Sequence, residues 1–326
     1  MRVLVTGGSG YVGSSAVREL SEAGHEILIY DNLSTGHRKL SKGYELIEGD
    51  IADRDKLRLC LKRADAVMHF AASAYVGESV LNPRKYFRNN VESAIALMDS
   101  VLESDVRLIV YSSSCAVYGI PHTLPIDEST PKEPINPYGA TKLFFEQVLS
   151  AYGVSHGLRY VALRYFNAAG THPSGEIGEI HTPETHLIPL AIRAALGSTP
   201  PLTVYGSNID TPDGTCIRDY IHVSDLASAH LKALHYLADE GASVALNLGT
   251  GIGTSIAEVI SLIEEFTNRK VPRVYAPQRA GDPQALFADA RKAKEILGWN
   301  TKFNIRQIIT GAVRWEENIS DYLKRP

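Results

Sequence analysis

Tyr138 and Lys142 are the residues whose types and spacing point most directly to a chemical activity. Side chains four residues apart lie on one face of a helix, so a phenol and an ammonium group would be neighbours here. We expect the cation to stabilise the phenolate and to lower the pKa of Tyr138 from its usual value of about 10. A phenol tuned in this way can take a proton from a hydroxyl group at neutral pH, which predicts acid–base catalysis.

A glycine-rich run near the start supplies the second motif. Gly7, Gly10 and Gly13 fall between a predicted strand and a predicted helix, and the run from Gly8 to Gly13 also has the GxGxxG spacing. A tight turn there exposes backbone N–H groups and the positive end of a helix dipole, which suit a pyrophosphate. The motif predicts a nicotinamide dinucleotide, which would accept the hydride, over the alternative of a turn without a ligand.

Asp31 ends the second predicted strand. A carboxylate at that position accepts hydrogen bonds from the adenosine ribose and repels a 2′-phosphate, which favours NAD over NADP. Arg38 and Lys39 follow soon after and keep NADP open as the weaker alternative. Asp31 could instead cap a turn, and Asp50, which follows the third strand, could cap the helix that begins near residue 53.

Short apolar runs alternate with longer amphipathic segments in the first half of the chain. The predicted strands are 3–6, 26–30, 44–47, 66–70, 107–111 and 160–164, and the predicted helices are 11–23, 53–62, 83–102 and 138–152. This order predicts an α/β fold with a Rossmann-type, doubly wound parallel sheet. Ser114 follows the fifth strand, so it and the glycine turn should meet at the carboxyl edge of the sheet, where such sheets bind ligands.

The amino-acid composition of the chain changes near residue 167, where glycine, proline and polar residues become frequent. We expect an NAD-binding domain over 1–167 and a smaller, interleaved substrate domain over 168–326. Segments near 217–250 should return to the first domain, because 244–248 resembles another strand of its sheet. The glycines of 249–253 are interpreted as a structural turn rather than a second phosphate loop.

Composition restricts the classes of function. The chain has 326 residues, 21% of them charged, and a net charge of -4, which argues against nucleic-acid and membrane-surface partners. We expect no transmembrane segment and no secretion signal. Cys60, Cys115 and Cys216 lack metal-like spacing, which predicts free thiols and a cytoplasmic protein. The eleven histidines show no ligand spacing either, so no metal is expected.

The sequence resembles the extended short-chain dehydrogenase/reductase family almost end to end, and within it the UDP-sugar 4-epimerases. The resemblance is carried by TGGSGYVG (6–13), YDNLSTG (30–36), GDIAD (49–53), HFAA (69–72), VGES (76–79), NNV (89–91), YSSSCAVYG (111–119), NPYGATK (136–142), LRYFNAAG (163–170), HPSGEIGE (172–179), DGTCIRDYIHVSDLA (213–227), NLGTGIG (247–253) and RAGDP (279–283). This set is far more specific than either short motif.

The resemblance implies a role for each matching position. Ser114 would hydrogen-bond the 4-oxygen of the sugar, Tyr138 would be the acid/base, and Lys142 would bind the nicotinamide ribose. Other positions would contact NAD: Gly7, Gly10, Tyr11, Val12, Gly13, Asp31, Asn32, Leu33, Ser34, Thr35, Gly36, Asp50, Ile51, Phe70, Ala71, Ala72, Asn89 and Phe166. A third set would hold the UDP-sugar: Asn167, Arg218, Arg279 and Asp282.

The implied activity is the interconversion of UDP-galactose and UDP-glucose by transient oxidation at C4. UDP-N-acetylhexosamines and UDP-pentoses are alternative substrates, since Leu286 occupies the position that limits sugar size. A dehydratase is disfavoured because Cys115 and Ala116 stand where dehydratases carry an acidic pair, and an NAD-binding protein without activity would not need the Ser–Tyr–Lys set.

The resemblance also implies a homodimer formed through helices 83–102 and 138–152, although burial against the sheet would explain many of the same apolar positions. The chain departs from its relatives at two places. Ala74 replaces a lysine of some relatives near the nicotinamide, and His186 replaces an asparagine that contacts the nucleotide-sugar.

Overall fold

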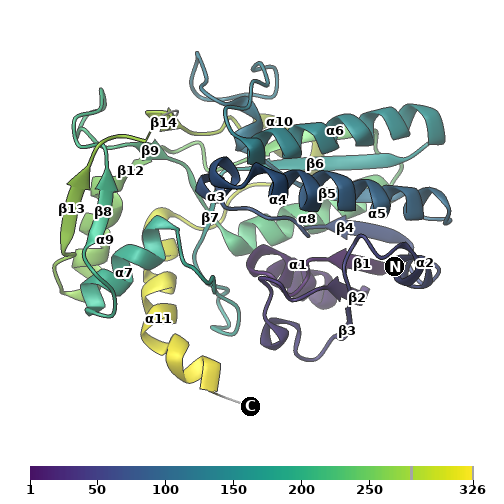
Figure 1. Cartoon of the computed structure of the whole chain (residues 1–326), viewed down its shortest axis with the longest axis horizontal. Coiled ribbons are helices and arrows are strands. Elements are labelled where there is room, and N and C mark those ends of the chain that lie inside the picture. The colour runs from purple at the N-terminus through teal and green to yellow at the C-terminus, as the bar shows by residue number, and fades with distance from the viewer. Residues whose placement is uncertain (280–281, 325–326) are drawn as a thin grey trace.

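A seven-stranded parallel sheet forms the centre of the computed structural model, which describes residues 1–279 and 282–324 (Figure 1). The second and third positions of the 279–283 block, residues 280 and 281, therefore lie outside the described residues. The strands follow the order β3-β2-β1-β4-β5-β6-β11. Their bounds are β1 Arg2–Thr6, β2 Glu26–Asp31, β3 Glu45–Glu48, β4 Ala66–His69, β5 Leu108–Ser114, β6 Arg159–Tyr165 and β11 Val244–Leu248.

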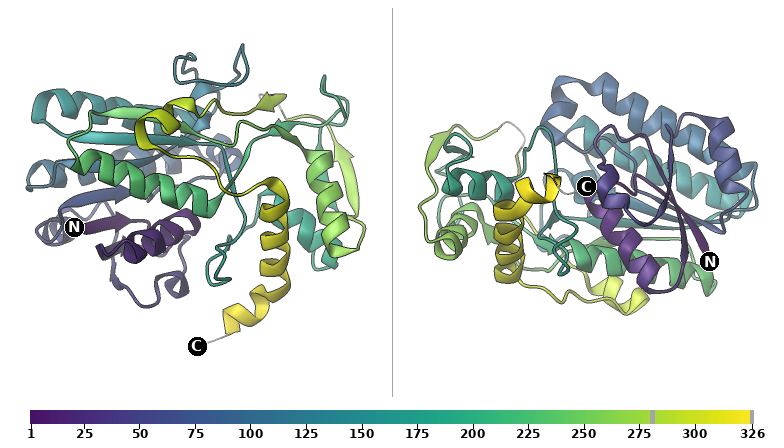
Figure 2. Two further views of the ribbon diagram at one scale, coloured as in Figure 1. Left: turned by 180° about the vertical axis from the view of Figure 1, so that it is seen from behind. Right: turned by 90° about the horizontal axis from the view of Figure 1, so that it is seen from below.

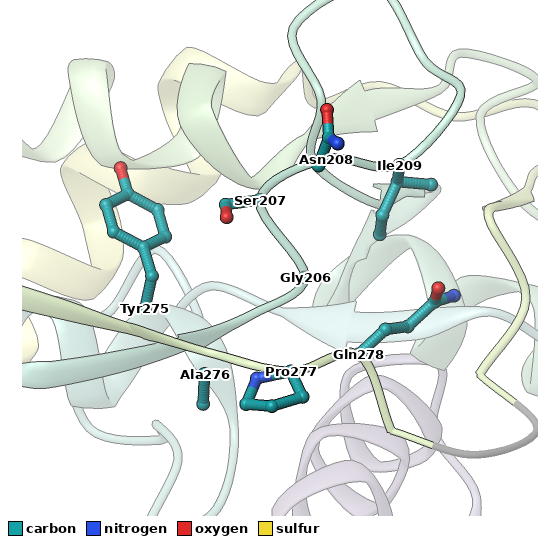
Figure 3. A pocket seen from close by; sticks show the side chains of 8 residues that line it. All are labelled: Gly206, Ser207, Asn208, Ile209, Tyr275, Ala276, Pro277 and Gln278. Atoms are coloured by element: carbon teal, nitrogen blue, oxygen red, sulfur yellow. The ribbon is translucent and has the colours of Figure 1, made fainter.

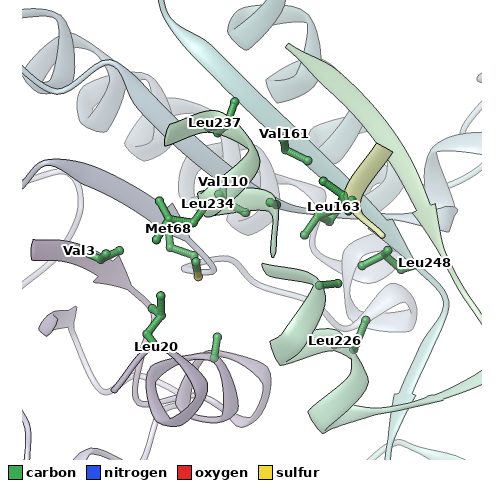
Figure 4. Packing of buried hydrophobic residues seen from close by; sticks show 14 of the residues in the cluster. Val3, Leu20, Met68, Val110, Val161, Leu163, Leu226, Leu234, Leu237 and Leu248 are labelled. Carbon is green, nitrogen blue, oxygen red and sulfur yellow. The ribbon is translucent and has the colours of Figure 1, made fainter. Parts of the chain in front are cut away.

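Helices cover both faces of the sheet, because the strands carry apolar side chains on both faces. One face packs against α1 (Tyr11–Glu22), α8 (Val223–Ala238) and α10 (Arg291–Leu297). Figure 4 shows part of this layer, in which Leu20 of α1 and Leu234 of α8 belong to the same cluster as Val3 of β1.

The opposite face packs against α2 (Arg54–Leu61), α5 (Ser93–Leu102) and α6 (Pro137–His156). Leu4 of β1 lies there in one cluster with Leu97 of α5 and Phe145 of α6. Strands buried on both faces read as continuous apolar runs, which is why the sequence identified them. The predicted doubly wound fold is confirmed.

The helix predicted over 83–102 is confirmed, but it contains a π-helical turn. Pro83 starts α4 (Pro83–Phe87) after the cap residue Asn82, and a π-helical turn (Arg88–Glu92) leads into α5. A further short helix, α3 (Val76–Leu81), comes before α4. The wider π turn accommodates the buried Asn90, which the helical periodicity alone did not reveal.

A second group of elements lies to one side of the sheet (Figure 2). Its helices are α7 (Leu187–Leu196), α9 (Ile256–Thr267) and α11 (Ile305–Lys324), which enclose a separate apolar core. Its short strands are β7 (Asn167–Ala169), β8 (Leu202–Tyr205), β9 (Ile217–Arg218), β10 (Tyr220–His222), β12 (Thr254–Ser255), β13 (Arg273–Ala276) and β14 (Ala285–Leu286).

The chain crosses between the two groups more than once. It leaves the large sheet at the carboxyl end of β6 and enters β7 directly, then returns through α8 and β11, which pairs with β6. Side chains from both groups therefore meet at the carboxyl edge of the sheet. Among the described residues, no helix is long and apolar enough to cross a membrane.

Candidate active site

The start of α6 places Tyr138 beside Ser114. Asn136 caps this helix by accepting a hydrogen bond from the N–H of Gly139 at 2.8 Å, and Pro137 occupies the first turn. A side chain on Gly139 would overlap the carbonyl oxygen of Ala116. The absence of a side chain lets α6 pack tightly against the 3-10 turn that follows β5, and this contact brings the phenol to the end of that strand.

The structure brings the three predicted catalytic residues together. Ser114 ends β5 and Tyr138 faces it, with 7% and 8% of their surfaces exposed. The Ser114 hydroxyl accepts a hydrogen bond from the N–H of Ala116 at 3.1 Å and is within hydrogen-bonding reach of the Tyr138 phenol. The Lys142 ammonium donates to the carbonyl of Ser112 at 2.7 Å and lies 5.8 Å from the centre of the Tyr138 ring.

The expectation that Lys142 lowers the pKa of Tyr138 is wrong for the protein by itself. Burial raises the pKa of Tyr138 well above its usual value, the nearby Tyr165 phenol adds to this, and the hydrogen bond from Ser114 offsets only part of it. Burial also lowers the pKa of Lys142 to about 7, against an opposing effect of Glu146. Lys142 alone therefore does not offset the effect of burial on Tyr138.

A buried ion pair supports α6 behind these residues. Arg164 of β6 donates to the Glu146 carboxylate, at 2.9 Å from Nε and at 2.5 Å from Nη2, and 4% and 8% of the two side chains are exposed. Ser113 donates to Glu146 at 2.5 Å and Arg164 donates to the Tyr118 hydroxyl at 2.9 Å. The sequence analysis missed this network, although Glu146 follows Lys142 by one helical turn.

The glycine turn has the shape that a dinucleotide needs. Gly7 has a φ of +75°, and a side chain there would overlap the backbone of Ala71, while one on Gly13 would overlap the carbonyl of Gly7. Helix α1 begins at Tyr11 after Gly10, and no side chain caps its first turn. These uncapped N–H groups, next to a backbone open to close approach, fit a pyrophosphate.

Asp31 caps a turn, which is one of the two roles that the sequence left open. Its carboxylate is 7% exposed and accepts hydrogen bonds from the N–H groups of Ser9 at 2.9 Å and Leu33 at 2.8 Å. It therefore braces the glycine turn against the loop after β2, where Asn32, Leu33, Ser34, Thr35 and Gly36 lie. Burial raises the pKa of Asp31, and its backbone hydrogen bonds counteract this.

Asp50 is a capping residue, as the alternative interpretation stated, but it does not cap the helix that begins near residue 53. It accepts hydrogen bonds from the N–H of Ala52 and the amide of Asn32, both at 2.9 Å, whereas Asp53 caps α2. Ile51 beside it is buried.

The remaining predicted NAD positions lie around the ends of β4 and β6. Phe70, Ala71 and Ala72 follow β4 directly, and Phe166 follows β6 in a buried cluster. Asn89 donates to the hydroxyl of Ser73 at 3.2 Å.

Asn90 was overlooked by the sequence analysis. Its buried amide accepts from the Ser73 N–H at 2.8 Å and donates to the Ser73 carbonyl at 2.9 Å and to the Thr141 hydroxyl at 3.1 Å. It thereby ties the segment after β4 to α6, next to the predicted catalytic residues. The NNV block gave a signal for it, but did not distinguish between its two asparagines.

The residues expected to hold a UDP-sugar gather where the second group of elements faces the sheet. Arg218 of β9 donates to the Asp282 carboxylate at 2.6 Å, and the Arg279 guanidinium lies 3.9 Å from the centre of the Tyr205 ring. Asn167 is exposed at the start of β7, and Leu286 pairs with Arg218 in the register of β14 and β9. Two arginines held by a carboxylate and an aromatic ring are suited to a diphosphate.

A pocket of about 300 Å³ lies next to this region, between the ends of β8 and β13 (Figure 3). It is lined by the segments Gly206–Ile209 and Tyr275–Gln278 and includes none of the three predicted catalytic residues. Its lining adjoins Tyr205 and Arg279 in sequence.

The glycines at 249–253 form a structural turn rather than a free phosphate loop. The buried Asp219 carboxylate accepts hydrogen bonds from the N–H groups of Thr250 at 2.9 Å, Gly251 at 3.0 Å and Ala288 at 3.1 Å. These donors are therefore not available to an anion. Asp219 was not predicted as a site residue, yet it ties the turn at 249–253 and the segment at Ala288 to the chain next to Arg218.

Comparisons with known proteins were made on the whole chain. Residues 3–249 match the NAD dependent epimerase/dehydratase family. A UDP-glucose 4-epimerase of Rhizobium meliloti (strain 1021) is 48% identical over 315 residues, which cover 96% of each chain.

Solved structures agree with this match. The UDP-glucose 4-epimerase from Brucella ovis in complex with NAD superposes with a TM-score of 0.94 at 50% identity, covering 97% of this chain and 98% of that one. The enzyme from Stenotrophomonas maltophila, with bound NAD and formylated UDP-arabinopyranose, superposes with a TM-score of 0.95 at 39% identity, covering 98% and 99%.

Proposed function

Because the chain belongs to the NAD dependent epimerase/dehydratase family, we propose that it is an NAD-dependent UDP-glucose 4-epimerase that interconverts UDP-galactose and UDP-glucose. The observation that carries the proposal is the convergence of Ser114, Tyr138 and Lys142 at the carboxyl edge of the sheet, beside the glycine turn. Family membership supports the type of reaction, and this arrangement supports the assignment of these three residues to it.

NAD fits the residues of the first group of elements. The uncapped turn at the start of α1 would hold its pyrophosphate, and Asp31 would accept hydrogen bonds from its adenosine ribose. When bound, NAD supplies the acceptor and then the donor of the sugar C4 hydride. We assign this function to residues 1–167 together with α8 and β11, and the binding of the UDP-sugar mainly to 168–326.

Tyr138 acts as the acid/base in this mechanism. Its phenolate removes the proton of the 4-hydroxyl group, while Ser114 holds the same oxygen by a hydrogen bond. The resulting 4-keto sugar turns over, and Tyr138 returns the proton as reduction occurs on the opposite face. Burial raises the pKa of Tyr138, so the phenolate must be stabilised by positive charge in the assembled complex. The Lys142 ammonium, held by the Ser112 carbonyl, is the protein's contribution to that charge.

The nucleotide stays in place while the sugar moves. Arg218 and Arg279 would grip the diphosphate, with Asp282 and Asn167 beside them. The intermediate must rotate, so the sugar itself should be held weakly. Leu286 lies beside Arg218 and is smaller than a tyrosine, which keeps UDP-N-acetylhexosamines as alternative substrates. UDP-pentoses require only a smaller pocket, whereas Cys115 and Ala116 supply no acid for a dehydratase.

Purified protein is expected to convert UDP-galactose into UDP-glucose without added NAD, because the cofactor takes part in both half-reactions and remains bound. Chromatography of a panel of UDP-hexoses, UDP-N-acetylhexosamines and UDP-pentoses would measure the preference. Conversion of only the N-acetylated or pentose pair, with NAD saturating, would show that the hexose assignment is wrong while the family chemistry holds.

We further propose that the protein is a cytoplasmic homodimer. The three cysteines are free thiols, which suits a reducing compartment. Large apolar side chains are exposed on α3, α4 and α6, which pack against one another: Leu81 is 86% exposed, Phe87 46% and Phe144 41%. Such a patch is typical of a protein interface.

Phe144→Glu is expected to convert the dimer into a monomer, because it places a charge inside the proposed helical interface. Light scattering coupled to size-exclusion chromatography would measure the mass. Val154→Glu is the matched control, since Val154 is a 90% exposed apolar residue near the end of the same helix. Equal masses for the two variants would rule out this face as the interface.

A further inference from the structure

Four side chains converge in the segment that precedes α7, a feature that the proposed catalysis does not use. Glu179, His181, Glu184 and His186, called here the His/Glu cluster, place one potential ligand atom each within 4.8 Å of one another. The sequence analysis gave the histidines no part in a metal site. The structure brings two of them together with two carboxylates.

The two carboxylates of the cluster are buried, which makes their charges costly. Only 3% of the Glu184 side chain and 8% of that of Glu179 are exposed, against 18% for His181 and 41% for His186. The rings of Tyr11 and Tyr75 lie edge-on to His181, at 6.3 and 5.8 Å between ring centres. Two carboxylates shielded from water in this way need a cationic partner.

Two of the four ligand atoms have no hydrogen-bond partner among the described residues. The Oε1 atom of Glu184 accepts from the N–H groups of Thr185 at 2.8 Å and His186 at 2.9 Å, but its Oε2 atom is unpartnered. The Nδ1 atom of His181 lies 3.2 Å from Glu179 and 3.7 Å from Oε2 of Glu184, without a hydrogen bond to either. A buried, unpartnered carboxylate oxygen therefore faces an unpartnered imidazole nitrogen.

The neighbouring charges do not satisfy these atoms. Arg193 comes within 3.9 Å of Oε2 of Glu184, but its guanidinium is bound by both oxygens of Glu316, at 2.7 and 3.0 Å. His186 lies 2.8 Å from each of Glu179 and Glu184. Burial would lower the pKa of His186, but the two carboxylates outweigh it and raise that pKa to about 10.

We propose that the His/Glu cluster binds one Zn²⁺ ion, which fixes the segment before α7 against the glycine-turn side of the molecule. Two imidazole nitrogens and two carboxylate oxygens form a donor set that suits zinc, and four protein ligands make a closed, structural site rather than a catalytic one. The ion would influence the cofactor site only indirectly, through the side chains that pack between them. Tyr11 is one such side chain, since it lies beside His181 and donates to the carbonyl of Gly170 at 2.5 Å.

The test uses the NAD-bound enzyme after dialysis against a chelator, titrated with Zn²⁺ by calorimetry. We expect about one equivalent to bind, with a rise in melting temperature. His181→Ala/Glu184→Gln should weaken binding by at least about 100-fold, since even the loss of an outer partner of a metal ligand costs 10–100-fold. Glu184→Gln alone retains an oxygen that can accept the hydrogen bonds from the N–H groups of Thr185 and His186. Weaker Zn²⁺ binding in this variant would therefore report the loss of a metal ligand rather than a loss of folding.

His122→Ala is the matched control, because this exposed histidine lies outside the cluster. It should bind Zn²⁺ as the unchanged protein does. Co²⁺ in place of Zn²⁺ should give the visible absorption of a four-coordinate site, absent from the double variant. The proposal is overturned if the unchanged protein binds no equivalent, or if the double variant binds equally well, which would place the ion on the thiols or on surface histidines.

Discussion

Tyr138→Phe is expected to reduce turnover by a factor of about 10² to 10⁴, the range that a positioned acid/base contributes. The substitution removes only the phenolic oxygen, so the ring still packs at the start of α6 and NAD should remain bound. Turnover of UDP-galactose, with bound cofactor measured separately by absorbance after denaturation, would check both halves of the expectation.

Tyr152→Phe is the matched control. Tyr152 lies on the same helix but more than three turns from the site, beside His156, so its loss should leave turnover near that of the unchanged protein. Equal rates for Tyr138→Phe and Tyr152→Phe would remove Tyr138 from the mechanism. Loss of NAD together with activity would instead make it a structural residue.

Arg164→Met is expected to lower the free energy of unfolding by about 3–5 kcal/mol, because it leaves the Glu146 carboxylate buried without its partner. Urea denaturation with NAD saturating in every sample would measure the loss, since a difference in cofactor occupancy would otherwise contribute. The double variant Arg164→Met/Glu146→Leu should recover much of the stability, because it removes the unpaired charge as well.

Arg306→Met is the surface control for this experiment. Arg306 forms an ion pair with Glu265 in which both side chains are 53% exposed, and such pairs contribute at most about 1 kcal/mol. A similar, small loss in the two single variants would contradict the importance of burial. No recovery in the double variant would mean that the side chains matter for their packing rather than their charge.

The sequence by itself was enough for the fold class and for the positions of most elements. Apolar runs such as 3–6 and 26–30 are local features, and strands buried on both faces need them wherever they lie in the chain. The family resemblance, drawn from thirteen blocks, was confirmed by the match over residues 3–249. The helix over 83–102 was predicted, but its π turn depends on where the buried Asn90 makes its bonds.

The site residues divide in the same way. Spacing alone placed Tyr138 and Lys142 on one helical face, because the pitch of a helix is fixed. Their pKa values were decided by burial, a sum over neighbours from β5, β6 and α6 that no local pattern contains. A motif predicts which groups lie close together, whereas their protonation depends on how far the whole fold buries them.

The sequence therefore determined this protein's glycine turn, its parallel sheet and the spacing of the proposed catalytic residues, since each follows from steric and periodic rules over a few positions. Only the tertiary structure decided the partners of Arg164, Asp219 and Glu184. Those partners come from distant segments or from a loop whose course is not periodic, and the energy of a buried charge depends on all the groups that enclose it.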